Sequence, residues 1–284
     1  MTPLQRWRDE VGDVTALGAV RIAFGLLLLQ SAVRAVQGLG DGYFGDVFHW
    51  PILPEALVPS RGVYSLVVGI QVLLAVLVVA GVRAREALLA SAVIGAYVLA
   101  CDRLQFHHNR WALLCLAALL SMTPCDRAFR LGAGAGPRVG PLWAVRLAQL
   151  QVSLVYVASG GSKLLDPDWR SGQVILERFR LYGGQAIQAG VPQRIVAWLA
   201  QPEVAGVLSK LAIGTELFLA VGLWSRRARW SALVLGVGFH LVIEATARVE
   251  GFSWLMIASY GLFFLPELGV RLVRFLRPTA RTIK

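Results

Sequence analysis

The sequence predicts an all-α fold, a polytopic transmembrane helical bundle of about eight spans with the N- and C-termini in the cytoplasm. Hydrophobic residues occupy 56% of the 284 positions, charged residues occupy only 16%, and the mean hydropathy is +0.61. A soluble domain carries about 25% charged residues. Apolar segments of roughly 20 residues, the length that crosses the hydrocarbon core, recur along the chain. Because lipid offers the backbone no hydrogen-bond partners, each such segment must be a helix.

No polar linker divides the apolar segments, so we expect a single transmembrane domain over residues 1–284. The spans are expected at about residues 15–36, 63–82, 87–104, 111–123, 142–164, 204–224, 230–246 and 251–265. In the connection formed by residues 166–203, apolar residues such as Val174 and Phe179 alternate with charged ones at helical spacing. This pattern predicts one or two amphipathic helices on the outer face of the membrane.

The net charge of +11 comes from arginines in short runs between the apolar segments. This placement is typical of cytoplasmic loops that lie against an anionic leaflet, and it does not indicate nucleic-acid binding. Fifteen basic residues fall on the side of the two termini and eight fall on the opposite side. We therefore expect a multi-pass protein of the inner (plasma) membrane, with the lipid bilayer as its partner and both termini in the cytoplasm.

The fifth span carries polar and small residues along one side. Gln149, Ser153, Tyr156, Gly160 and Lys163 are spaced 4, 3, 4 and 3 residues apart, which places them on one helical face. In lipid such a face must point into the bundle or into water. It is either a packing seam that ends in a snorkelling lysine or a cleft in which a desolvated amine serves as a general base. The chain has only three lysines, so a lysine at this place is unusual.

Polar residues also interrupt other spans. His240 and Glu244 share a face of the seventh span, either as a polar ladder that locks helices together or as contacts to a ligand. Glu216 lies in the middle of the sixth span, where an unpaired carboxylate is costly, so it either has a partner, for which Arg21 of the first span is a candidate, or is protonated. Asn109 is expected to cap the start of a helix.

His107 and His108 open the fourth helix as direct neighbours, so they do not share a helical face. The chain has four histidines and no HExxH motif, and we expect no metal site. With the expected topology, the polar residues of interest gather on the outer side of the membrane. They are Asp41, Tyr43, His49, His107, His108, Lys163, Asp166, Asp168, His240 and Glu244.

Several short motifs occur in a fixed order along most of the chain. They are Arg21-Ile22-Ala23-Phe24-Gly25, Gly42-Tyr43-Phe44, Trp50-Pro51-Ile52-Leu53, Phe106-His107-His108-Asn109, Pro141-Leu142-Trp143, Gln151, Val155-Tyr156, Gly160, Lys163-Leu164, Asp166 with Asp168-Trp169 and Gly172, and Phe239-His240. With these motifs the chain resembles the HTTM (horizontally transferred transmembrane) family, which comprises the membrane domain of vitamin K-dependent γ-glutamyl carboxylase and its bacterial relatives.

The resemblance implies a catalytic role for Lys163. In the carboxylase, a lysine of the matching block is regarded as the base that deprotonates reduced vitamin K, and a histidine assists it, which points to His107 or His108. The implied cofactor is a reduced quinone of the menaquinol or vitamin K type. We expect the cleft around this base to be lined by Tyr156, Ser162, Asp168, Trp169, His240 and Glu244.

The chain departs from the family pattern in three respects. Ser162 stands where the family has the first of two adjacent lysines, Leu165 is an additional residue before Asp166, and the chain ends soon after the eighth span. We therefore expect no lumenal β-rich region and do not expect glutamate carboxylation itself. The first hypothesis is a quinol-dependent enzyme, carboxylase-like or oxygenase-like. The alternative is a non-catalytic accessory membrane protein for the maturation or export of a secreted or membrane-anchored peptide. The third, a transporter, is disfavoured because no internal repeat is found.

Overall fold

The computed structural model describes residues 2–41, 50–132, 138–188, 190–247 and 249–276. Within these residues the chain is mostly helical, as the sequence predicts, and one short sheet accompanies the helices. The chain divides into two compact units. Unit 1 comprises Met1–Ala148 and Phe264–Lys284, and unit 2 comprises Gln149–Phe263. The expectation of a single domain over residues 1–284 stays a prediction.

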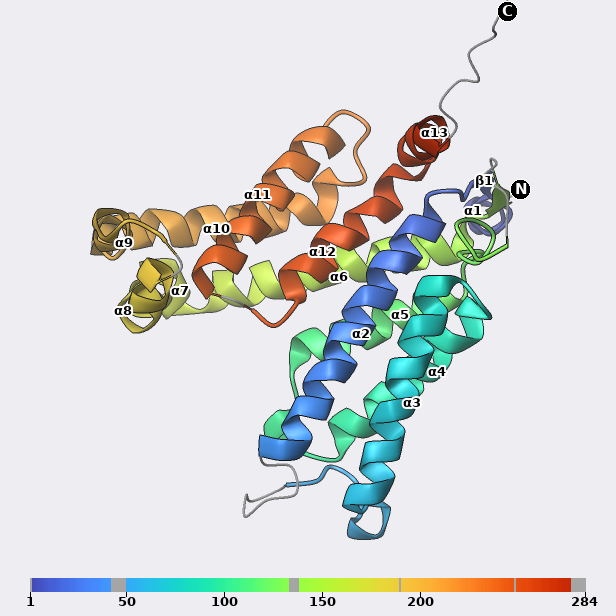
Figure 1. Ribbon diagram of the computed structural model, residues 1–284. Helices are drawn as coiled ribbons and strands as arrows, with labels where there is room; N and C mark the ends of the chain where they lie inside the picture. Colours follow the sequence, from blue (N-terminus) through green and yellow to red (C-terminus); the bar gives the residue numbers. More distant parts are fainter. Residues whose placement is uncertain (1, 42–49, 133–137, 189, 248, 277–284) are drawn as a thin grey trace, which may run out of the picture. The chain divides into compact units, whose positions relative to one another are not determined.

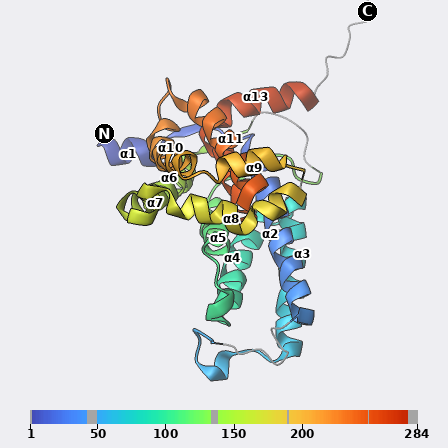
Figure 2. The same ribbon diagram turned by 90° about the vertical axis from the view of Figure 1, so that its left-hand side faces the viewer.

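Unit 1 is built on helices that follow one another along the chain. They are α2 (Leu17–Asp41), α3 (Arg61–Ala80), α4 (Ala84–Ala100) and α5 (His108–Ser121). Figures 1 and 2 show α2 beside α3 and α4 beside α5, and α3 also packs on α4. The shorter helices of this unit are α1 (Pro3–Arg8), η1 (Glu55–Leu57), η2 (Arg103–Gln105) and α13 (Leu265–Leu276).

A two-stranded antiparallel sheet ties the N-terminal segment to the segment that precedes α6. In this sheet β1 (Val11–Asp13) pairs with β2 (Val139–Pro141). Arg146, in the first turn of α6 (Trp143–Leu165), donates hydrogen bonds to both carboxylate oxygens of Glu10. The start of α6 is therefore fixed to the N-terminal segment within unit 1.

Arg21 lies in the first turns of α2 and is completely buried. Its Nη2 donates to the backbone carbonyl of Phe129 at 2.5 Å, and Gly81, which ends α3 in the left-handed region, lies directly against its guanidinium. Arg21 was a candidate partner of Glu216, and the structure corrects this: Glu216 accepts hydrogen bonds from Lys163 within unit 2. Both charges lie in apolar helices, and the hydropathy pattern cannot tell which helices meet.

Unit 2 contains most of α6 and the elements that follow it. They are α7 (Pro167–Ser171), α8 (Gln173–Gln188), α9 (Gln193–Leu199), α10 (Pro202–Gly222), α11 (Arg229–Ala247), α12 (Phe252–Tyr260) and η3 (Gly261–Phe264), the last of which ends at the first residue of unit 1. The long helix α10 packs against α7, α8 and α11, and α11 packs against α12. The helix α10 is thus the element that connects the short helices of this unit to its long ones.

The connection between α6 and α10 contains three helices, where the sequence predicts one or two. The C-cap of α7 is Gly172, which has a left-handed φ of +88°. It lies so close to the backbone of Gly206 that there is no room for a Cβ at this position. Pro192 then forms the N-cap of α9 and separates it from α8. The buried side of α8, which includes Leu176 and Ala186, packs against α10 and α11.

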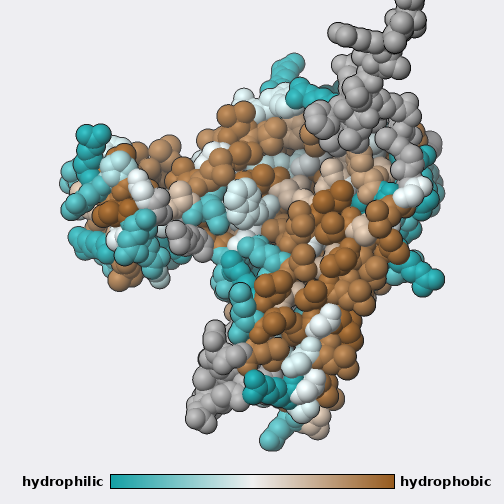
Figure 3. Space-filling view, in the orientation of Figure 1, coloured by the Kyte–Doolittle hydropathy of each residue, from teal (hydrophilic) through white to brown (hydrophobic). Residues whose placement is uncertain are grey.

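Some helical stretches are long and apolar enough to cross a membrane. Among the described residues there are four, Leu17–Gln37, Arg61–Ala80, Pro202–Gly222 and Phe252–Arg271. Many side chains of α2 and α3 are apolar and exposed, and Figure 3 shows a broad hydrophobic surface over these two helices. A surface of this kind is typical of contact with lipid. Each of the eight expected spans coincides with a helix, whereas their number as membrane crossings and the side of the termini stay predictions.

Candidate functional site

The polar stripe of α6 faces the interior of unit 2. Gln149, Ser153, Tyr156 and Gly160 are buried, and the side chain of Lys163 is 17% exposed. Hydrogen bonds join two of them to other parts of unit 2. The amide of Gln149 donates to the carbonyl of Leu262, and the Ser153 hydroxyl accepts from the indole N–H of Trp224. The prediction that these residues share one helical face is therefore confirmed.

Lys163 forms the polar centre at the C-terminal end of α6. Its Nζ lies 2.8 Å and 2.7 Å from the two carboxylate oxygens of Glu216, and it also donates to the Ser159 hydroxyl at 2.5 Å. Ser159 in turn donates to the Glu216 carboxylate at 3.0 Å. The ring of Trp169 lies 5.0 Å from Nζ, within the range of a cation–π interaction. Together these four residues form the Lys163 cluster.

The local sequence explains why these groups meet. Ser159 and Lys163 are four residues apart and therefore lie one above the other on α6. At Gly160 an added Cβ would lie 3.2 Å from the Cβ of Glu216, so the glycine allows α10 to approach closely. Asp166 caps α7 by accepting from two backbone N–H groups, one of them that of Trp169, and this turn carries the Trp169 ring back toward Lys163.

A second polar cluster lies on the same face of α6, about two turns before Lys163. The Tyr156 hydroxyl lies 2.7 Å from Nε2 of His240 and 2.5 Å from the Tyr260 hydroxyl. All three side chains are buried, with at most 1% exposed. Gly236 lies against the Tyr260 hydroxyl, where any side chain would overlap it. Tyr156 and His240, which were both expected to line a cleft, thus contact each other, and Tyr260 is an additional member of this cluster. Their place in a cleft stays a prediction.

The remaining predicted residues of unit 2 have different surroundings. Ser162 is exposed and its hydroxyl donates to the Ser159 carbonyl, while Asp168 is exposed in the first turn of α7. Glu244 is partly buried, and its Oε2 has no hydrogen-bond partner among the described residues. The role of Ser162, Asp168 and Glu244 in a cleft stays a prediction.

The two predicted histidines of unit 1 lie at the start of α5. Nδ1 of His107 accepts from the backbone N–H of Asn109 at 3.4 Å. The N-cap of α5 is therefore His107, whereas Asn109 was expected in this role from the sequence. His108 is exposed, and its ring packs edge-on against Phe106. Lys163 belongs to unit 2, so a cleft shared with either histidine stays a prediction. Tyr43 and His49, which were expected on the same side, lie outside the described residues.

Sequence reasoning did not single out two members of these clusters, Ser159 and Tyr260, and it did not identify Lys163 as the partner of Glu216. The usable signal for Ser159 was its spacing of four residues from Lys163. Nothing in the sequence marks Tyr260 beyond a hydroxyl in an apolar segment. Among the described residues, no group of three or more His, Cys, Asp and Glu side chains is arranged to hold a metal ion.

The Lys163 cluster can hold and move a proton. An ammonium group and a carboxylate in direct contact differ from a neutral amine and a carboxylic acid only by one proton shift along the hydrogen bond. Taking either charge out of water without the other is costly, so each group depends on its partner. With a partly accessible amine at one end and a buried carboxylate at the other, the cluster has the parts of a base with a proton store.

Comparison with known proteins gives one match. The family model of the HTTM domain matches residues 10–267, which include all of unit 2 and the helices α2, α3, α4 and α5 of unit 1. No curated protein and no solved structure matches the chain.

Proposed function

The chain belongs to the HTTM family and is an integral membrane protein, and from this premise we propose that it acts on a reduced quinone by base-assisted chemistry at Lys163. The observation that carries the proposal is the contact between the partly accessible amine of Lys163 and the buried carboxylate of Glu216. Ionisable groups in a membrane interior are costly, and they are kept where they serve a function.

The Lys163 cluster fits a quinol in its chemistry. Trp169 provides a flat aromatic surface of the kind on which another aromatic ring packs. The side chain of Lys163 is 17% exposed and that of Glu216 only 6%, so Lys163 is the more accessible member of the pair. A bound quinol supplies ionisable hydroxyl groups and two electrons for an oxidant. The amine of Lys163 is the group that would contact such a hydroxyl.

Lys163 can act as a base only in its neutral form. Glu216 provides that form, since a proton that shifts from Nζ to the carboxylate leaves an amine lone pair and a neutral acid. The Lys163 amine then accepts a hydroxyl proton, while Glu216 retains the first one. Ser159 donates to Glu216 and accepts from Lys163, so it keeps the two groups aligned in either protonation state. General-base catalysis of this type contributes about 10²- to 10⁴-fold to a rate.

The proposed topology places this chemistry outside the cytoplasm. Eight membrane crossings with cytoplasmic termini, in the inner (plasma) membrane, put the C-terminal end of α6 on the outer side. The excess of basic residues on the side of the termini supports this orientation. A membrane-dissolved quinone would reach the Lys163 cluster from the bilayer, and His107 or His108 would assist as the resemblance implies.

The test compares Lys163→Arg with Lys210→Arg in purified protein supplied with menaquinol. Arginine retains the charge and the hydrogen-bond donors toward Glu216 but does not give up its proton. Lys210 is exposed on α10, the helix that also carries Glu216, so it is a matched control. We expect quinol oxidation and oxygen uptake to fall at least ~100-fold in Lys163→Arg and to be unchanged in Lys210→Arg. Wild-type turnover in Lys163→Arg would overturn the proposal.

A second candidate is a non-catalytic accessory protein that helps a secreted or membrane-anchored peptide to mature or be exported. One observation favours it. The ammonium of Lys163 donates to Ser159 and to Glu216. These contacts are also those of an ion pair that only holds α6 and α10 together. This candidate requires that Lys163→Arg support peptide release in the host as well as the wild type does, and that the purified wild type lack turnover with menaquinol.

A further inference from the structure

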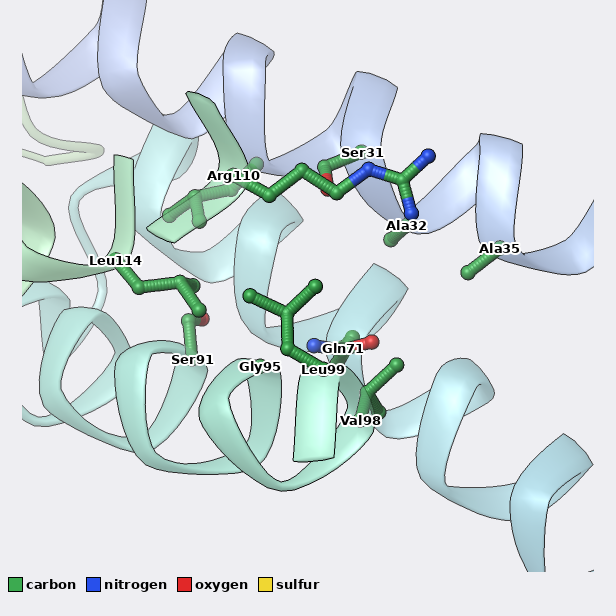
Figure 4. A pocket seen from close by; sticks show the side chains of 11 residues that line it. Ser31, Ala32, Ala35, Gln71, Ser91, Gly95, Val98, Leu99, Arg110 and Leu114 are labelled. Carbon is green, nitrogen blue, oxygen red and sulfur yellow. The ribbon is translucent and has the colours of Figure 1, made fainter. Parts of the chain in front are cut away.

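The aromatic ring of the proposed substrate needs a surface on which to bind. In unit 1 a cavity lies among α2, α3, α4 and α5, and Figure 4 shows the side chains that line it, among them Gln71, Ser91 and Arg110. Its volume is about 30 Å³, whereas a cavity that takes up benzene has about 150 Å³. A quinol ring therefore does not fit there, and in unit 2 the ring of Trp169 is the surface to consider.

The Trp169 ring lies close to the amine that would act on such a substrate. Its centroid is 5.0 Å from Nζ of Lys163. The three N–H groups of this ammonium donate to Ser159 and to the two carboxylate oxygens of Glu216. A ligand ring that packs on Trp169 places its hydroxyl at a distance from Nζ that depends on where the Trp169 ring is held. The contacts that hold Trp169 therefore matter for the chemistry at Lys163.

A hydrogen bond from α10 holds the turn that carries this ring. The hydroxyl of Ser209 donates to the backbone carbonyl of Trp169, and Ser209 is completely buried. One turn earlier on α10, Gly206 lies against the backbone of Gly172, so closely that there is no room for a Cβ at Gly172. Because α7 has only five residues, these two contacts fix it against α10.

The hydroxyl of Ser209 behaves differently from that of an ordinary serine in a helix. Such a hydroxyl commonly donates to the backbone carbonyl four residues earlier, as Ser259 of α12 does. Ser209 instead donates to a group outside its own helix. It also lies seven residues, or two turns, before Glu216 and therefore on the same face of α10. One face of α10 thus holds both the carboxylate partner of Lys163 and the carbonyl of Trp169.

We infer that Ser209 is a positioning residue that sets the Trp169 ring beside the amine of Lys163. A substrate ring that packs on Trp169 then brings its hydroxyl within reach of this amine. Ser209 does not touch the substrate itself, because it acts through the turn of α7. The inference rests on the proposed function for the identity of the substrate, whereas the position of the Trp169 ring is measured independently of any reaction.

The first measurement is the NMR signal of Lys163 in full-length protein that carries labelled lysine and is reconstituted in lipid nanodiscs. The chain has only three lysines, so Lys163→Arg assigns the signal. An aromatic ring shifts protons over its face upfield, and we expect the ε-methylene protons of Lys163 upfield of those of the exposed Lys210. Most of this difference should disappear in Ser209→Ala. Trp169→Leu, which removes the ring, marks its complete loss.

The second measurement is turnover of the purified protein with menaquinol. Ring packing stabilises the bound substrate and the transition state alike, so Ser209→Ala should raise KM about 2- to 10-fold and leave kcat nearly unchanged. Ser259→Ala is the matched control, because it removes a buried hydroxyl that bonds within its own helix. This control should leave both the Lys163 signal and KM unchanged.

The inference and the proposed function fail in different ways. An unchanged Lys163 signal in Ser209→Ala would overturn the inference, since the Trp169 ring would then keep its place without the hydroxyl. A wild-type KM in Ser209→Ala would overturn it as well, because the position of the ring would then not affect substrate binding. Wild-type protein that does not turn over menaquinol would overturn the proposed function, and with it the substrate role of Trp169.

Discussion

The amine of Lys163 contacts both carboxylate oxygens of Glu216, at 2.8 Å and 2.7 Å, and thereby joins the end of α6 to the middle of α10. With side-chain exposures of 17% and 6%, the pair is largely removed from water. A buried ion pair adds little net stability compared with two apolar residues, but each partner depends strongly on the other. The pair should therefore show a large coupling whether or not it is catalytic.

Lys163→Met is expected to lower the free energy of unfolding by ~3–5 kcal/mol, because Glu216 is left as an uncompensated buried charge. Adding Glu216→Leu to this variant should recover most of the loss, since the double variant buries no charge. The measurement is a double-mutant cycle from chemical unfolding in detergent. Lys210→Met serves as the exposed control and should change stability by less than ~0.5 kcal/mol. Additive losses in the cycle would contradict the coupling.

Tyr156→Phe is expected to destabilise unit 2 by ~1–3 kcal/mol, because it leaves His240 Nε2 and the Tyr260 hydroxyl buried without their partner. Tyr260→Phe removes one of the two hydrogen bonds and should cost less. Because the two tyrosines share a bond, the double variant should lose less than the sum of the single losses. Tyr182→Phe, on the exposed side of α8, is the control. A larger loss for Tyr260→Phe than for Tyr156→Phe would refute the central place of Tyr156.

Much of this arrangement follows from the sequence. Composition and apolar periodicity predict an all-α membrane protein, and the spacing of Gln149, Ser153, Tyr156, Gly160 and Lys163 predicts the buried face of α6. Spacing works here because the residues of one helix have fixed relative positions. The helix starts are less predictable, as the capping role of His107 in place of Asn109 shows.

Partners on different helices could not be predicted in the same way. Glu216 needs a cation, and both Arg21 and Lys163 lie in apolar segments, so hydropathy alone leaves the choice open. The structure decides it through Gly160, where the missing side chain lets α10 come close enough for Glu216 to reach Lys163. The Phe129 carbonyl that binds Arg21 belongs to a loop whose path no sequence pattern indicates.

Gly81→Ala is expected to destabilise unit 1 far more than an ordinary glycine substitution. Gly81 has a φ of +77°, and an added Cβ would overlap Nη1 of the buried Arg21 and lie 2.6 Å from the Cβ of Arg130. Gly132→Ala is a matched control, because Gly132 has the same φ but no atom within 4 Å of an added Cβ. In Gly132→Ala the unfolding free energy should fall only by the ~1–2 kcal/mol that a left-handed backbone costs a residue with a Cβ. Equal losses, measured as unfolding free energies, would mean that the contact with Arg21 is unimportant.

Glu10, which precedes the first expected span, makes stability depend on pH through its pairing with Arg146. The hydrogen bonds from Arg146 hold the pKa of the Glu10 carboxyl below its ordinary value of 4.5. Between the folded and unfolded pKa values of Glu10, the unfolded chain binds more protons than the folded one. The pair with Arg146 therefore adds its full contribution to the unfolding free energy above about pH 4.5, and this contribution is lost as the pH falls further. Since the side chains of Arg146 and Glu10 are 28% and 36% exposed, this contribution to the unfolding free energy amounts to at most ~1 kcal/mol.

Glu10→Gln should therefore lower the unfolding free energy by up to ~1 kcal/mol at neutral pH, and the difference from wild type should shrink as the pH falls from about 5 toward 3. Arg146→Gln should show the same pH dependence, because it removes the donors that stabilise the carboxylate. Glu203→Gln, an exposed carboxylate at the start of α10, is the control for the loss of one negative charge. A difference between wild type and Glu10→Gln that stays constant from neutral pH to pH 3 would show that the Glu10 carboxylate draws no stability from Arg146.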